Sequence, residues 1–253
     1  MTAATKRAWP LWLGRAALVL ALIAAVAAVA GPTLARFDAV PKLSGFMAFV
    51  IALRSAMWIA ALAALALVLG WIVVRRTSWA AVVGLGLAGT LLAVGGWLRG
   101  EAESYPAIHD VTTDLDNPPA FAELAIPDDN LRGVETEDEW RRLHREGYAD
   151  IAPVEVVGSV SAAIARAERL ARARGWTVAS ADRQAGRMEA VAYAGWPRFE
   201  DIVVLTARPA SDGGTRLDMR SISRVGVSDL GYNGKRIREF LGAMAAAEDG
   251  PAS

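Results

Sequence analysis

The 253-residue chain has a formal net charge of zero, but its two halves are oppositely charged. Residues 1–99 hold nine Lys or Arg and one acid, whereas residues 100–253 hold eighteen Lys or Arg and twenty-six acids. The acidic second half lacks the basic surface that nucleic-acid binding requires, so no nucleic-acid partner is expected. The chain has no cysteine, which excludes disulfides, thiolate catalysis and cysteine metal sites.

Three apolar runs of twenty residues each occupy most of the first half: Leu11–Ala30, Ser55–Val74 and Trp79–Leu98. Twenty residues of helix are about 30 Å long, which is about the thickness of one hydrocarbon core. Tryptophans lie near the ends of these runs, as in the aromatic belt of membrane-spanning helices. Residues 1–99 are therefore predicted to form a three-helix transmembrane region in contact with membrane lipid.

The predicted orientation follows from the positive charges next to the spans, because such charges are enriched on the cytoplasmic side. These charges are Lys6, Arg7, Arg15, Arg75 and Arg76. The loop Gly31–Gly45 and the second half then face outward, although Arg36, Lys42 and Arg54 weaken the contrast. We therefore expect a multi-pass protein of the cytoplasmic (inner) membrane with its C-terminal domain outside the cytoplasm. Whether the first span is cleaved after Ala30 stays open.

A glycine pattern in the third run, Gly84-Leu-Gly86-Leu-Ala-Gly89, matches the dinucleotide-binding fingerprint. That fingerprint requires a strand before it and a helix opening after it. Here the pattern lies inside an apolar run of twenty residues. We expect close helix packing instead, through a stripe of small residues formed by Ala80, Gly84 and Ala88.

The segment Tyr105–Phe121 separates the apolar half from the soluble half and is dense in His, Asp, Thr and Asn. Pro118 and Pro119 deny it a helix, and Asp and Asn favour turns. It contains no glycine, unlike a flexible linker, and it offers large apolar side chains for burial. It is predicted to pack against the following domain, as part of an ordered polar region spanning residues 100–153.

Residues 154–247 are predicted to form an α+β domain in the order β-α-β-β-β-β-α. The predicted strands are Val154–Val157, Trp176–Ala181, Arg187–Ala194, Asp201–Arg208 and Arg216–Ser223. One helix follows Ser159 or Ser161 and runs to about Arg174, and the other begins near Ser228 and Asp229. Alternating apolar residues indicate a half-buried antiparallel sheet. The order fits a curved sheet gripping two helices, as in the TATA-binding-protein-like fold, without implying DNA binding. Residues 248–253 are expected to be a disordered tail.

His109 and Asp110 form the one catalytic pair that the sequence offers, with Asp110 as the partner that would orient the imidazole. The second histidine, His144, lies among arginines on a predicted helix and is expected to be solvated. Asp114, Asp116 and Asn117 could supply oxygen ligands to a hard divalent cation. Their spacing matches no EF-hand loop, and turn-forming hydrogen bonds to the backbone are the favoured interpretation. No cofactor is expected.

A second polar cluster consists of Arg220, Arg224 and Asp229. Ser228 and Asp229 at a helix start, with glycines nearby, could form a site for an anionic ligand such as a lipid headgroup. A helix cap with ion pairs is the favoured structural alternative.

The soluble half resembles the bacterial domain-of-unknown-function family 1499 from about Tyr105 to Leu241. The residues that carry the resemblance are Ile108-His109-Asp110-Val-Thr112-Thr113-Asp114, Pro118-Pro119-Ala-Phe121, Tyr148-x-Asp150-Ile151-x-Pro153, Gly186-Arg187-Met188-Glu189-Ala190, Arg220-Ser221-Ile-Ser223-Arg224-Val225-Gly226-x-Ser228-Asp229-Leu230-Gly231 and Arg236-Ile237-x-x-Phe240. The chain departs from the pattern at Ala149, where proline is expected, and at Phe199-Glu200, where Lys-Asp is expected. The resemblance implies a bacterial envelope protein and implies no activity or catalytic residues.

Two functions are therefore carried forward from the sequence. The leading hypothesis is a membrane-anchored, non-catalytic envelope protein whose outer domain binds a partner protein or a lipid-like ligand. The alternative is a hydrolase or isomerase that uses His109 with Asp110.

Overall fold

The structure is a computed structural model that describes residues 9–211 and 213–246. The chain forms two compact units. The first unit comprises the chain up to Glu101 together with Trp196–Arg198, and the second comprises Ala102–Gly195 and the chain from Phe199 onward. The tail predicted for residues 248–253 lies outside the described residues.

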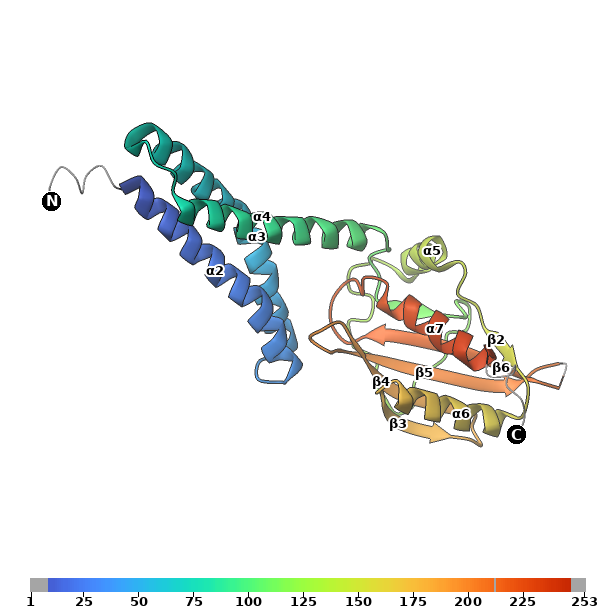
Figure 1. The fold of residues 1–253 in the computed structure, drawn as a ribbon. Helices are drawn as coiled ribbons and strands as arrows, with labels where there is room; N and C mark the ends of the chain where they lie inside the picture. Colours follow the sequence, from blue (N-terminus) through green and yellow to red (C-terminus); the bar gives the residue numbers. More distant parts are fainter. Residues whose placement is uncertain (1–8, 212, 247–253) are drawn as a thin grey trace. The chain divides into compact units, whose positions relative to one another are not determined.

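The first unit contains three helices that are long and apolar enough to cross a membrane (Figure 1). They are α2 (Trp9–Arg36), α3 (Lys42–Leu69), which continues as the π-helix η1 (Gly70–Val74), and α4 (Trp79–Glu103). The three predicted spans are thus confirmed as helices. All three are longer than predicted, and the predicted loop Gly31–Gly45 shortens to residues 37–41. Lys42 stabilises this short turn, because its Nζ lies 2.7 Å from Asp38 Oδ1 and donates to the Ala35 carbonyl at 2.6 Å.

Small residues let the helices of this unit approach closely. A Cβ atom added at Gly84 would lie 3.0 Å from the backbone nitrogen of Leu18, so only glycine fits between α4 and α2 without a shift. Ala81 and Ala88 are fully buried beside it. The predicted packing role of Gly84 and Ala88 is confirmed, whereas Ala81 takes the buried place predicted for Ala80. The glycine pattern is explained by helix contact.

The second unit is an open antiparallel sheet with three helices (Figure 1). Its strands are β1 (Asp110–Thr112), β2 (Val154–Val156), β3 (Thr177–Asp182), β4 (Arg187–Ala194), β5 (Phe199–Pro209) and β6 (Thr215–Ser223). Its helices are α5 (Glu137–Tyr148), α6 (Val160–Ala173) and α7 (Tyr232–Ala246). The strand order is β1-β6-β5-β4-β3, and β2 also pairs with β6. From β2 onward the element order is the predicted β-α-β-β-β-β-α, and the class is α+β.

Strand β1 is an addition to the predicted sheet. Asp110, Val111 and Thr112 lie opposite Ile222, Ser221 and Arg220 of β6. Strand β2 pairs with the other end of β6, so β1 and β2 share one edge of that strand. The segment Tyr105–Phe121, predicted to be irregular, therefore contains a short strand because β6 offers an unpaired edge to it.

Helices α6 and α7 cover one face of the sheet (Figure 1). Trp176, just before β3, stacks on Phe240 of α7 with ring centroids 4.8 Å apart. The residues predicted to face inward from α7 are all buried: Ile237, Phe240, Leu241 and Met244. The sheet residues predicted to face the same core are buried against them: Val203, Leu205, Ala207, Leu217 and Met219. The helix-side core thus follows the sequence pattern.

The opposite face of the sheet differs from the prediction of a half-buried sheet. Ile202, Val204 and Ile222 lie on that face and are fully buried. Glu189 lies on the same face, is fully buried, and accepts hydrogen bonds from three successive backbone N–H groups of residues 122–124, at 2.6, 3.0 and 2.8 Å. The polar segment after β1 is thereby fastened across this face, which explains why the centre of the sheet is buried on both sides.

Candidate functional site

The polar residues of the segment around β1 converge on Asp110. Both oxygens of its buried carboxylate accept from Arg220, with Nε to Oδ1 at 2.9 Å and Nη2 to Oδ2 at 2.6 Å. Asn130 donates to the same Oδ2 at 2.6 Å. Such bidentate, charge-assisted pairs are stronger than hydrogen bonds between neutral groups. The carboxylate is therefore engaged with Arg220 and Asn130, and it makes no hydrogen bond to the His109 ring.

Helix α5 is attached to β1 through two aromatic ring nitrogens. Trp140 Nε1 donates to the Asp110 carbonyl at 2.9 Å, and the Thr112 N–H donates to His144 Nε2 at 3.1 Å. His144 is only 2% exposed, so the expectation of a solvated histidine was wrong. Trp140, His144 and Tyr148 recur every four residues and form the buried stripe of α5. Burial lowers the pKa of His144 to about 4, and Asp110 opposes this shift.

His109 lies at the centre of the site without a partner for its ring. Its carbonyl accepts from the Ser223 N–H at 3.0 Å and from Asn233 Nδ2 at 2.8 Å. The side chain is 2% exposed, and neither ring nitrogen meets hydrogen-bond geometry with any described residue. Burial lowers the pKa of His109 and the nearby Arg132 lowers it further, whereas Asp110 and a poorly aligned contact with the Val227 backbone oppose the shift. The imidazole is thus held neutral inside the domain.

The space beside the His109 ring is small. Its free volume is about 0 Å³, and it is lined by residues from β1, from the segment before α5 and from α5 itself. Ligand sites usually enclose about 300–1,000 Å³. The space therefore accommodates no molecule the size of an ordinary substrate in this arrangement.

A second buried network centres on Asn233, in the first turn of α7. Its side-chain oxygen accepts from Ser221 Oγ at 2.7 Å and from Arg236, and its nitrogen donates to Ser223 Oγ at 2.9 Å. Arg236 Nη2 lies 2.5 Å from Asp201 Oδ2. The sequence prediction missed Asn233 and Asp201. The available signal was Ser221 and Ser223, polar residues on the same strand face as the apolar Leu217 and Met219.

The predicted ligand-binding residues Arg220, Arg224 and Asp229 each have a separate partner. Arg220 is paired with Asp110, and Arg224 Nε lies 3.3 Å from Glu200 at the surface. Asp229 is buried and accepts from the backbone N–H groups of Gly231 at 3.0 Å and Asn233 at 2.5 Å. Asp229 thus caps the start of α7, and its burial raises its pKa. Ligand binding at these three residues stays a prediction.

The predicted cation ligands form a turn. Asp114 Oδ1 accepts from the N–H groups of Asp116 at 3.1 Å and Asn117 at 2.9 Å. Its other oxygen lies 3.7 Å from Arg216. Within residues 9–211 and 213–246, no group of three His, Cys, Asp or Glu side chains is close enough to hold one ion. The hydrogen bonds are those of the turn network that the sequence also favoured.

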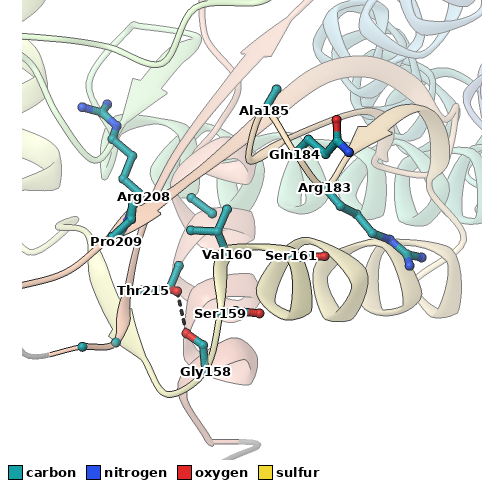
Figure 2. A pocket seen from close by; sticks show the side chains of 13 residues that line it. Gly158, Ser159, Val160, Ser161, Arg183, Gln184, Ala185, Arg208, Pro209 and Thr215 are labelled. Atoms are coloured by element: carbon teal, nitrogen blue, oxygen red, sulfur yellow. Dashed lines mark hydrogen bonds between the residues drawn. The ribbon is translucent and has the colours of Figure 1, made fainter.

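A hollow of the second unit lies away from these networks, at the end of the sheet where three turns meet (Figure 2). It is about 760 Å³ and open to solvent. Ser159 caps α6 by accepting from the Ala162 N–H, and Thr215 Oγ1 donates to the Gly158 carbonyl at 2.7 Å (Figure 2). The charged side chains among its described lining residues are Arg183 and Arg208. The described wall thus presents no carboxylate or imidazole for acid–base chemistry.

The chain is an α+β domain joined to three apolar helices, with a polar segment bound across its sheet. The model of a family described as a protein of unknown function (DUF1499) matches residues 110–244. This match covers more than half of the chain, and the chain belongs to that family. The resemblance read from the sequence is thereby confirmed. Comparison with curated proteins and with solved structures gave no match.

Proposed function

We propose that the protein is a membrane-anchored envelope protein that acts by binding, with its soluble unit outside the cytoplasm. Its ligand is a lipid-like molecule or surface, and a partner protein is the second candidate. The observation that carries this proposal is the engagement of the polar residues: Asp110, Asp201, Asp229 and Glu189 all hold backbone or side-chain groups of the domain itself. Such a domain is a rigid body that presents a surface.

The alternative, a hydrolase or isomerase built on His109, has less support. A catalytic imidazole needs an orienting partner and a substrate within hydrogen-bond reach. Asp110 is turned to Arg220 and Asn130, and the space beside the ring has a free volume of about 0 Å³. His109 resembles a buried histidine that fills the interior, since burial keeps it neutral.

The variant His109→Leu tests this choice directly. Leucine has a similar volume and needs no hydrogen bond, so replacing an unpaired buried imidazole should leave the melting temperature unchanged or raise it. The variant should also fully restore any phenotype of a strain that lacks the gene. A normally folded His109→Leu protein that fails to restore the phenotype would favour the enzyme.

The orientation can be tested with topology reporters. An export-dependent reporter fused after Ser253 should be active, because Arg75 and Arg76 mark the inner turn. The same reporter fused after Arg76 is the matched control and should be inactive, whereas a cytoplasm-dependent reporter should be active there. The reverse pattern would place the soluble unit in the cytoplasm.

A further inference from the structure

The exposed apolar side chains of the soluble unit gather in one place. Outside residues 196–198, its described residues expose six large apolar side chains. Five of them lie in the loops before α5 and α7 or at the first residue of α7 and are 39–54% exposed: Leu131, Val225, Val227, Leu230 and Tyr232. We call these five residues the apolar loop patch. The sixth, Val157, lies between β2 and α6. Such clustering on an otherwise polar domain marks an interaction surface.

The two loops are held together as one rigid surface. Arg132 Nε donates to the Gly226 carbonyl at 2.7 Å, and its Nη2 donates to the Ser223 carbonyl at 2.5 Å. A Cβ atom added at Gly133 would lie 2.9 Å from the Val227 side chain, so the loops are in contact. The patch is therefore a fixed feature of the domain.

Leu230 adds an independent indication that the patch matters. Its φ is +52°, in the left-handed region that glycine and asparagine adopt more easily than leucine. A leucine in that conformation, with 39% of its surface exposed, gains little from burial within the domain. Strained residues of this kind concentrate at binding sites and switches.

The patch adjoins the point where the chain leaves the apolar helix α4. Tyr105 follows the last residue of α4, Glu103, by two positions, and its ring lies against Gly231, where an added Cβ would be 2.5 Å away. The six steps along the helix from Trp97 to Glu103 rise about 9 Å. The headgroup layer on each side of a bilayer is about 5–7 Å thick. The chain thus enters the domain, next to the patch, close to the outer limit of the headgroups.

We propose that the apolar loop patch lies in the interfacial layer of the membrane that the chain spans and fixes the soluble unit on the lipid surface. This inference names the lipid contact of the proposed function and rests on it. Valine and leucine side chains enter the boundary of the acyl chains, and Tyr232 takes the interfacial place that tyrosine prefers. The charges beside the patch are paired: Arg224 with Glu200, and Arg132 with Asp129. Apolar burial is therefore the driving force, and headgroup charge contributes little.

The natural absence of cysteine allows single-site labelling of the full chain. Val227→Cys and Val157→Cys, each carrying a fluorophore, are compared in single-copy nanodiscs of phosphatidylcholine. Quenching by brominated lipid should be several-fold stronger at position 227 than at position 157, and quenching by aqueous iodide several-fold weaker. Both results should persist in about 1 M NaCl, where charge interactions are screened beyond about 3 Å.

Equal iodide access at positions 227 and 157 would overturn the proposal. A label at position 227 that becomes shielded from both brominated lipid and iodide when a second protein binds would also overturn it. The patch would then be a protein interface. Salt-released lipid quenching would replace the apolar mechanism with an electrostatic one. The proposed function is tested separately, by the His109→Leu variant and by the topology reporters. Neither of these experiments uses a label in the apolar loop patch.

Discussion

A soluble fragment that begins at Ala122 is expected not to fold, whereas one that begins at Gly100 should melt in a single cooperative transition. The shorter fragment lacks β1 and with it Ile108 and Val111, which are 2% and 0% exposed. Burying each of these side chains contributes roughly 1.5–3 kcal/mol. It also leaves Arg220 without Asp110, and breaking a buried pair costs about 3–5 kcal/mol. Together these losses approach the whole stability of a domain, about 5–15 kcal/mol.

Circular dichroism on both fragments checks this expectation. Two point variants of the longer fragment test whether specific contacts of the segment stabilise the domain, because they leave the length of the fragment unchanged. Asp110→Ala should lower the free energy of unfolding by about 3–5 kcal/mol, because it leaves a guanidinium buried and unpaired. Asp116→Ala, in the same segment but exposed, should change it by less than about 0.5 kcal/mol. Equal melting temperatures for the two fragments would show that the segment is not part of the domain.

The elements with a clear local pattern could be predicted from the sequence. The apolar spacing of α7 and the alternation in β5 and β6 specify which side chains face the core, because period and burial are coupled in both structures. The buried stripe of α5 was also readable, since Trp140, His144 and Tyr148 recur every four residues. His144 was nevertheless expected to be exposed because arginines surround it in the sequence. Charged neighbours on a helix therefore say little about the burial of residues on its opposite face.

The contacts that build the site could not be predicted, because they join residues far apart in the chain. Asp110 and Arg220 were assigned to two different clusters, yet they form one ion pair across 110 positions. Glu189 holds backbone groups of residues 122–124, which no sequence pattern announces. Likewise β1 is a strand because β6 has an open edge. The sequence of a polar segment does not indicate which surface will form hydrogen bonds with its backbone N–H and C=O groups.

The apolar half shows the same division between local and long-range information. Arg54 interrupts the apolar run, so the sequence places the start of the second span at Ser55, whereas α3 begins at Lys42. A helix continues through a single charge when its backbone stays hydrogen-bonded. The apolar run therefore predicts that a span exists, but it places the start of the helix too late in the chain.

The stability of the soluble unit is expected to fall steeply as the pH decreases below about 6.5. Burial lowers the pKa of His144 to about 4 in the folded domain, and the pKa of His109 is lowered in the same direction. The unfolded chain then binds more protons than the folded one between about pH 6.5 and 4. The stabilising contribution is complete above the unfolded pKa and is lost as the pH falls toward the folded pKa. For His144 alone the loss reaches roughly 3 kcal/mol.

The structural reason is that protonation of His144 places a hydrogen on Nε2, the atom that accepts the Thr112 N–H. The strand β1 and helix α5 then lose one of the two bonds that join them. Urea unfolding of the fragment 100–253 between about pH 7.5 and 4.5 measures the slope, to which His144 should contribute about 1.4 kcal/mol per pH unit below about pH 6.5. His144→Gln supplies an amide oxygen as acceptor and cannot be protonated, so its slope should be shallower although its stability at neutral pH is somewhat lower. Identical slopes for the two proteins would mean that His144 is not neutral in the fold and is not the source of the acid sensitivity.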